Sequence, residues 1–397
     1  MRMFLCLVLC LFSAIAPQDL YAQTSSNADS VLLVFRPYTS IRGQFAFYNA
    51  ELEVQENGSR IGFEISSRYK KLRLFAGIEL QVNLFRSESS FNLSNNTADG
   101  YIVADRVQAR QVLASRLGFL GADFGKNGQI TFGKQYSVYY DITSMTDKFT
   151  VFGAGASSTF VAGTDGGVTG TGRADQALSY RNKFGPVSVG AQLQFESADN
   201  NNIVDGLGIC LKTQVWKKLE VGVAYNRMFL DHDLIENNAV IGLERQPSWL
   251  AVGANYSTNT WELAVVYAHQ LNGDLTNGQI LNADLETIYP SVIFDADGWE
   301  GYGRYNWHRL SVMAGFNLYN PKNDIITPSG QRPLSADFKR RYYIIGTEFR
   351  PYRFTRLYAE GRIANGANGL GVKEQTVFTI GLRFDIEQTM TKRFLVK

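Results

Sequence analysis

The residues that could carry out catalysis are few and widely spaced in this sequence. Its histidines are His232, His269 and His308, which share no common motif. The hydrolase signatures G-x-S-x-G and H-E-x-x-H are both absent. A serine and a histidine from neighbouring strands could still meet, so a hydrolase built on His269 or His308 is an open alternative. We nevertheless expect a protein without catalytic residues.

Metal and thiol chemistry also have little support. Asp295-Ala-Asp297-Gly298 matches the start of a calcium-binding loop but lacks the later ligands, including the terminal glutamate. A plain acidic loop is the better interpretation. Cys6 and Cys10 lie near the N-terminus and leave Cys210 without a disulfide partner. Its place on a predicted strand indicates a small, inert, inward-facing residue, and we expect neither a metal nor another cofactor.

The N-terminus has the pattern of a secretory signal peptide. Arg2 supplies a positive charge, an apolar stretch follows from Phe4 to Ile15, and Ala22 offers a cleavage point. We therefore predict a signal peptide at residues 1–22. The remainder, residues 23–397, shows no linker and is expected to form one domain.

The composition of the chain favours strands that cross a membrane. The net charge of +2 argues against a nucleic-acid partner. Beyond the signal peptide there is no run of apolar residues long enough for a transmembrane helix. Aromatic residues nevertheless make up 13% of the chain, and they are interleaved with charged residues. This combination of strand-forming and charged residues is what a closed transmembrane β-barrel requires.

Alternating hydrophobicity marks the individual strands. From Leu72 to Leu84, every second residue is aliphatic and most of those between are polar, so one face would meet lipid and the other water. The length of this segment suits a tilted membrane crossing. The same pattern recurs along the chain and predicts an all-β antiparallel barrel of about 16 strands. The predicted strands are residues 40–54, 59–68, 72–86, 108–120, 128–136, 174–182, 186–196, 206–215, 219–228, 247–257, 260–270, 298–306, 309–319, 338–350, 354–364 and 374–386.

Short and long connections alternate between these strands. This is the arrangement of short periplasmic turns and longer extracellular loops. The short connections are at 69–71, 122–127, 183–185, 216–218, 258–259 and 351–353, and the long ones at 87–107, 137–172, 229–246, 271–297 and 320–337. An irregular segment as long as 137–172 is usually functional. We expect it to fold into the barrel and set the size and charge of a pore.

Three segments resemble the general diffusion porins of Gram-negative outer membranes. They are SRIGFE at 59–64, SRLGFLGADFGKNGQITFGKQYSVYYDITSMTDKF at 115–149 and RADQALSYRNKFG at 173–185. The resemblance implies a 16-stranded barrel with its third long loop folded inward, usually assembled as a homotrimer. It also implies contact with outer-membrane lipid and lipopolysaccharide, and passive diffusion of small hydrophilic solutes and ions.

The same resemblance implies a set of pore-lining residues. By motif position, Arg60, Arg116 and Arg173 resemble the arginines of the barrel wall. Asp147 resembles a carboxylate of the inward loop, and Tyr140 resembles a neighbouring aromatic residue. Arg42 is inward-facing by strand parity and would extend the basic wall. Opposed charges across a narrow, water-filled constriction favour polar solutes over apolar ones without a tight binding site.

Two departures from the family pattern leave other functions open. Val151 stands where a second loop carboxylate is expected, which predicts a constriction that favours cations less. The last predicted strand ends near Phe384 or Ile386 and is followed by a tail, whereas the family normally ends on an aromatic residue. The alternatives to a general porin are a substrate-selective outer-membrane channel and a barrel without transport activity, such as an adhesin or structural protein.

Overall fold

The computed structural model describes residues 30–83, 90–92, 103–105, 112–195, 202–281, 287–322, 324, 330 and 332–395. The predicted signal peptide lies outside these residues and stays a prediction. Within the described ranges, no helix is long and apolar enough to cross a membrane.

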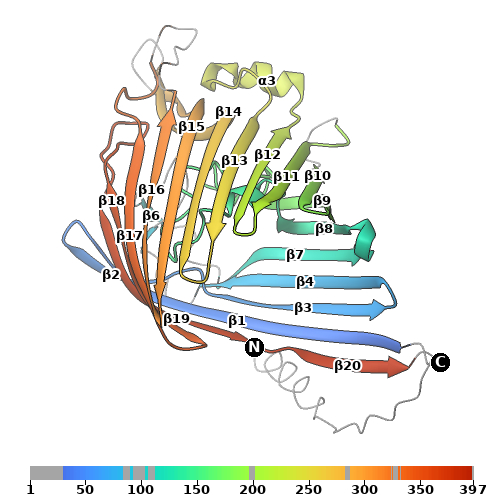
Figure 1. Ribbon diagram of the computed structural model, residues 1–397. Coiled ribbons are helices and arrows are strands. Elements are labelled where there is room, and N and C mark those ends of the chain that lie inside the picture. The colour runs from blue at the N-terminus through green and yellow to red at the C-terminus, as the bar shows by residue number, and fades with distance from the viewer. Residues whose placement is uncertain are drawn as a thin grey trace.

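The described strands form a closed antiparallel barrel of 16 strands, as the sequence predicts (Figure 1). Each strand pairs with the next along the chain, and β1 closes the ring by pairing with β19. The barrel strands are β1 (Ser30–Tyr48), β3 (Arg60–Tyr69), β4 (Leu72–Val82), β7 (Leu113–Asp123), β8 (Gln129–Tyr136), β9 (Arg173–Phe184), β10 (Val187–Gln194), β11 (Gly206–Trp216), β12 (Leu219–Met228), β13 (Ser248–Ser257), β14 (Trp261–Leu281), β15 (Thr287–Trp307), β16 (Leu310–Pro321), β17 (Arg340–Tyr352), β18 (Thr355–Ala364) and β19 (Val377–Glu387).

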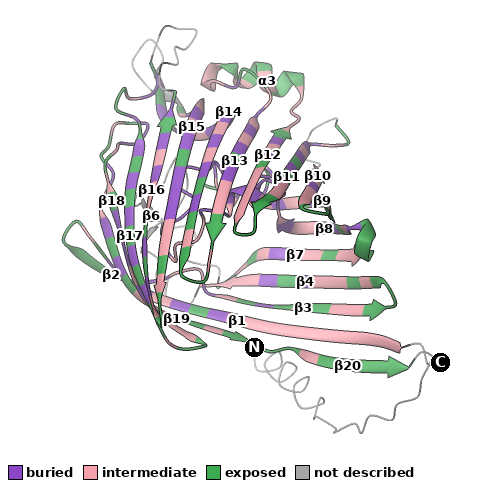
Figure 2. Ribbon diagram, viewed as in Figure 1, coloured by how far each residue is buried: buried purple, intermediate pink, exposed green. Residues whose placement is uncertain are grey.

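Side chains alternate between an apolar outer face and a largely polar inner face. On β17, Tyr343 and Ile345 are half exposed on the outside, whereas Tyr342 and Ile344, which alternate with them, are buried. Figure 2 shows the resulting alternation of buried and exposed residues along β15 to β18. An outer surface with so many exposed apolar side chains suits contact with lipid rather than water.

The first strand differs from its predicted bounds of 40–54. It begins at Ser30 and ends at Tyr48, where Asn49 and Ala50 turn the chain with positive φ values of 45° and 63°. The chain then returns as β2 (Glu51–Glu56), which pairs with β1. Pro37 obscures the early part of this strand because it has no N–H to donate. Its carbonyl oxygen still accepts a hydrogen bond from the Gln388 N–H.

The C-terminal tail is also a strand, contrary to the predicted end near residue 386. β20 (Met390–Leu395) pairs with the first residues of β1, in the register that β19 uses further along. The last segment of the chain thus continues along β1 beyond Glu387. β20 depends on pairing between the two ends of the sequence, so a local sequence pattern does not predict it.

The predicted connection at 271–297 is wrong for most of its length. β14 extends to Leu281 and β15 begins at Thr287, so the two strands form a long paired ribbon with register shifts. Asp295 and Asp297 therefore lie in a strand instead of an acidic loop, and Asp297 contacts the His269 ring at 2.8 Å. The ribbon is supported by an apolar cluster of Ile280, Val292, Phe294, Leu334 and Phe338 with their neighbours.

The remaining connections carry short elements. The connection at 229–246 contains α3 (His232–Asn238) and η3 (Ala239–Ile241). η2 (Gly125–Asn127) lies between β7 and β8. In the connection predicted at 87–107, β5 (Ser90–Asn92) pairs with β6 (Val103–Asp105), and the other residues of that connection lie outside the described part of the chain.

Candidate functional site

The segment 137–172 leaves the barrel wall after β8 and returns to it at β9. Its two ends are joined where the Ser137 N–H donates a 2.9 Å hydrogen bond to the Gly172 carbonyl oxygen. We call this junction of residues 137 and 172 the neck. Next to it, the Ser137 hydroxyl accepts a hydrogen bond from the Tyr140 N–H, at the start of the one-turn helix α2 (Tyr140–Thr143). The neck and the helix fix the direction in which the segment enters the barrel.

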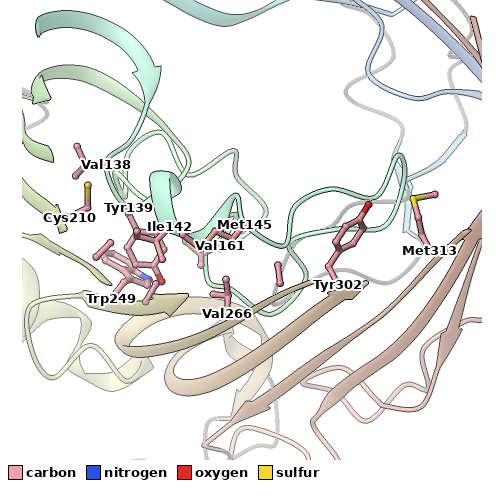
Figure 3. Close-up of a cluster of buried hydrophobic side chains, with 13 residues drawn as sticks. Val138, Tyr139, Ile142, Met145, Val161, Cys210, Trp249, Val266, Tyr302 and Met313 are labelled. Carbon is pink, nitrogen blue, oxygen red and sulfur yellow. The ribbon is translucent and has the colours of Figure 1, made fainter. Parts of the chain in front are cut away.

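An apolar cluster holds the first part of the segment against the inner face of β11 to β16 (Figure 3). Tyr139, Ile142 and Met145 on the segment are almost fully buried. They pack with wall residues that include Trp249 and Val266. Burial of this apolar surface stabilises the contact between segment and wall.

Carboxylates of the wall bind the backbone of the later part. Glu360 on β18 accepts hydrogen bonds of 2.6, 2.8 and 3.3 Å from the N–H groups of residues 150, 151 and 152. Glu300 on β15 accepts two bonds of 2.7 Å from Ala156 and Ser157. Asp274 on β14 accepts one of 2.8 Å from Ala162. Hydrogen bonds to a charged acceptor are among the stronger ones in proteins, so three strands hold the segment along its length.

Arginines line the inner wall on β7, β3 and β1. Arg116 Nε lies 2.7 Å from Glu79 Oε1, and Arg60 approaches the same oxygen at 3.6 Å. Arg42 on β1 donates a 2.8 Å bond to the Ser40 hydroxyl, which in turn donates to Asp385 at 2.7 Å. Arg60 and Arg116 therefore share Glu79, and Arg42 on the neighbouring strand joins a second series of contacts through Ser40 and Asp385.

The network continues around the wall through β19, β18, β17 and β15. Asp385 binds Arg383 at 2.7 Å and Arg356 at 3.1 Å. Arg356 also approaches Glu348 at 3.6 Å. Glu348 binds Arg304 at 3.0 Å and contacts Arg350 as well. We call the series from Arg116 to Arg304 the arginine network. Its arginines outnumber its carboxylates, so this half of the wall is positively charged.

Asp147 lies on the segment, at a position where wall charges act on it. Its carboxylate accepts a 2.7 Å hydrogen bond from the Tyr140 hydroxyl. Burial raises the pKa of Asp147, while the Tyr140 bond and the charges of Arg173, Arg60 and Arg116 oppose that rise. The next residue, Lys148, reaches Glu262 on the wall at 2.6 Å.

Arg173 is placed apart from the arginine network. It begins β9 and lies 3.2 Å from Asp165 on the segment. Lys134 approaches the same carboxylate at 3.0 Å. Although burial opposes it, Arg173 and Lys134 hold the pKa of Asp165 below its usual value.

Val151 has a structural position that suits an apolar residue. Its side chain is buried in a cluster with Phe152, Tyr342 and Ile344, while its N–H binds Glu360. The carboxylate next to residue 151 is therefore Glu360 of the wall, and the backbone of the segment binds it.

The sequence prediction missed much of the arginine network. Strand parity could have found the additional members because all of them lie on the inner face of their strands. They are Arg304, Arg350, Arg356 and Arg383, with the carboxylates Glu79, Glu348 and Asp385. Parity alone does not reveal the anchors Glu300 and Glu360, because their partners lie in an irregular segment.

Comparison with known proteins agrees with this architecture. A model for Gram-negative porins matches residues 25–362. Outer membrane porin F of Xenorhabdus nematophila is 25% identical over 287 residues, which cover 68% of this chain and 74% of that protein. Outer membrane porin F of Salmonella typhimurium is 32% identical over 188 residues, 45% of this chain and 50% of that protein. The matched region thus spans about half the length of the Salmonella relative.

Solved structures share the fold. OmpF of Salmonella typhi, in complex with daunomycin, gives a TM-score of 0.65 at 18% identity, covering 90% of this chain and 98% of that one. An anion-selective porin from Comamonas acidovorans gives 0.60 at 13% identity, covering 90% and 100%. The trimer form of OmpT from Vibrio cholerae gives 0.57 at 16% identity, covering 90% and 100%. The chain therefore belongs to the Gram-negative porins, which are channel proteins of the outer membrane and not enzymes.

Proposed function

We propose that this porin forms a water-filled channel for passive diffusion of small hydrophilic solutes and ions. Its constriction lies between the segment 137–172 and the arginine network. The observation that supports the proposal is the attachment of the segment to the inner wall, where Glu300 and Glu360 accept hydrogen bonds from its backbone N–H groups. The segment carries Asp147, and the charges of Arg173, Arg60 and Arg116 oppose the rise in the pKa of Asp147 that burial causes. Solutes pass between these groups and exchange part of their hydration for contacts with fixed charges.

The balance of charge at this constriction favours anions. Arginines outnumber carboxylates in the network, and they remain ionised at neutral pH because their intrinsic pKa is far above it. On the segment, Asp147 has Lys148 as its neighbour, and the apolar Val151 occupies the place of a second acid. Anions therefore meet a wall of excess positive charge and few opposing carboxylates.

Conductance measurements in planar lipid bilayers test this function. A general diffusion pore gives stepwise conductance that no single solute blocks. In a salt gradient, we expect a reversal potential whose sign indicates a preference for anions. Saturable block by one solute would instead support a substrate-selective channel. Tyr136 and Tyr140, stacked 4.8 Å apart beside Asp147, offer a surface for a ring-shaped solute in that case. The absence of any conductance would contradict both functions.

The homotrimer belongs to the same proposal. Its support is the shared fold with a porin that has a trimer form. We expect conductance steps in triplets and an oligomer on unheated gels that dissociates on heating. A monomer before heating would argue against the trimer while leaving the channel function intact.

A further inference from the structure

Five of the seven short turns of the barrel carry positive charge, and none of the seven carries negative charge. They comprise residues 70–71, 124–128, 185–186, 217–218, 258–260, 308–309 and 353–354, and none of them contains Asp or Glu. Their exposed cations are Lys70, Lys71, Lys126, Lys217, Lys218, Arg309 and Arg353. We call these residues the basic rim. Because successive hairpins follow one another around the barrel, the cations are distributed around its circumference (Figure 1).

Exposed aromatic side chains adjoin the basic rim. Trp216 is 71% exposed beside Lys217, Trp307 is 62% exposed near Arg309, and Tyr352 is 73% exposed beside Arg353. Aromatic side chains at the ends of membrane strands favour the level of the lipid headgroups. The rim cations next to them therefore lie at that level too.

The longer connection at 229–246, at the other end of the barrel, has a different charge. The connection at 229–246 carries Asp231, Asp233, Glu236 and Glu244 against the single cation Arg245. This connection therefore lacks the excess of positive charge that the rim carries. In a porin, the end with short turns faces the periplasm.

The rim cations are densest where two turns meet. Arg309 and Arg353 of the rim line an open cleft of about 730 Å³, together with Pro351, Tyr352, Phe354 and Arg350 of the arginine network. Arg309 is oriented by a 3.1 Å hydrogen bond to the Pro351 carbonyl oxygen. The Arg353 guanidinium lies over the Phe354 ring at 5.2 Å. The cleft therefore combines several cations with aromatic surface at the edge of the membrane.

We propose that the basic rim binds the phosphate groups of anionic phospholipids in the periplasmic leaflet. The charge of the rim is complementary to these headgroups, and its aromatic residues are suited to the boundary between headgroup and acyl chain. Its extent around the barrel fits a shell of lipids, whereas a docked protein would need one localised patch. The lipid shell holds the barrel at a fixed depth in the membrane.

Lipid selectivity in reconstituted vesicles tests the proposal. The full-length porin is placed in mixtures of phosphatidylcholine and phosphatidylglycerol, and spin-labelled versions of each lipid report the composition of the first shell. The wild-type protein should prefer phosphatidylglycerol, and high salt should weaken that preference. The double variant R309Q/R353Q should lower the preference by a factor of about 2 to 5.

Two further double variants make the result specific. K217Q/K218Q changes a separate turn and should also lower the preference. K322Q/K373Q removes the same charge from exposed residues of the long connections and should leave it unchanged. Unaltered conductance in pure phosphatidylcholine shows that each variant is folded. A failure of the lipid proposal can therefore be told apart from a failure of the proposed channel function. A wild-type protein without the preference, or rim variants that keep it in full, would overturn the proposal.

Discussion

The Glu300 carboxylate on β15 accepts a 2.7 Å hydrogen bond from the backbone N–H of Ala156 on the constriction segment. The same oxygen accepts a second bond from Ser157, and the other oxygen accepts one of 2.5 Å from the Thr146 hydroxyl. One wall side chain thus joins two separate parts of the segment. The segment is held by groups whose partners are far away in the sequence.

Replacement of Glu300 should loosen the constriction and destabilise the protein. Glu300→Ala leaves two N–H groups and a hydroxyl without their charged acceptor, which costs about 3 kcal/mol of the free energy of unfolding. Urea titration in lipid vesicles measures this loss, and single-channel recordings should show increased current noise. Glu236→Ala, on the exposed helix α3, is the control and should change neither quantity. Normal current noise and normal stability in Glu300→Ala would contradict the anchoring role.

Gly298 is required for the close approach of the segment to β15. A Cβ atom at this position would lie 1.7 Å from the Ala156 carbonyl oxygen, which is part of the backbone and cannot move alone. Gly298→Ala should therefore displace the segment and change the single-channel conductance. Gly303→Ala, on the same strand, has its nearest contact at 3.4 Å and serves as the control. Equal conductance in the two variants would show that the segment tolerates the added methyl group.

Charge reversal in the wall should shift ion selectivity toward cations. Arg116→Glu removes a cation of the arginine network and places a carboxylate beside Glu79. Arg173→Glu should act in the same direction near Asp165. The reversal potential in a salt gradient reports the change. Arg341→Glu, on the exposed outer face of β17, should leave that potential unaltered. An unchanged potential in both wall variants would place those residues away from the constriction.

Selectivity should also depend on pH through Asp147. Because its pKa is raised, this carboxylate takes up a proton at a higher pH than an ordinary aspartate. As the pH falls through that raised value, the constriction loses a negative charge and anion preference increases. Asp165, whose pKa is lowered, remains ionised over this range. Asp147→Asn should already have the increased anion preference at neutral pH, and its reversal potential should show no inflection as a function of pH. An inflection that survives in this variant would belong to another titratable group.

Strand periodicity, read from the sequence alone, determined the barrel and the direction of many side chains. An alternation of apolar and polar residues repeats every two positions, so it is visible in any short segment such as 72–84. It predicted that Arg42 faces inward, and Arg42 is buried on the inner face of β1, whereas Arg60 was a candidate from the resemblance. The resemblance to porins added the long segment and the residues Arg116, Arg173, Asp147 and Tyr140 as candidates.

The tertiary structure alone decided which of these groups meet and where the strands end. Arg116 reaches Glu79 because a register shift between β4 and β7 occurs at that point. β20 forms because the barrel closes between the two ends of the chain, and the ribbon of β14 and β15 is supported by Leu334 and Phe338 from a later connection. Side-chain parity is a local property of a strand, whereas register, closure and the anchoring of an irregular segment depend on partners distant in the sequence.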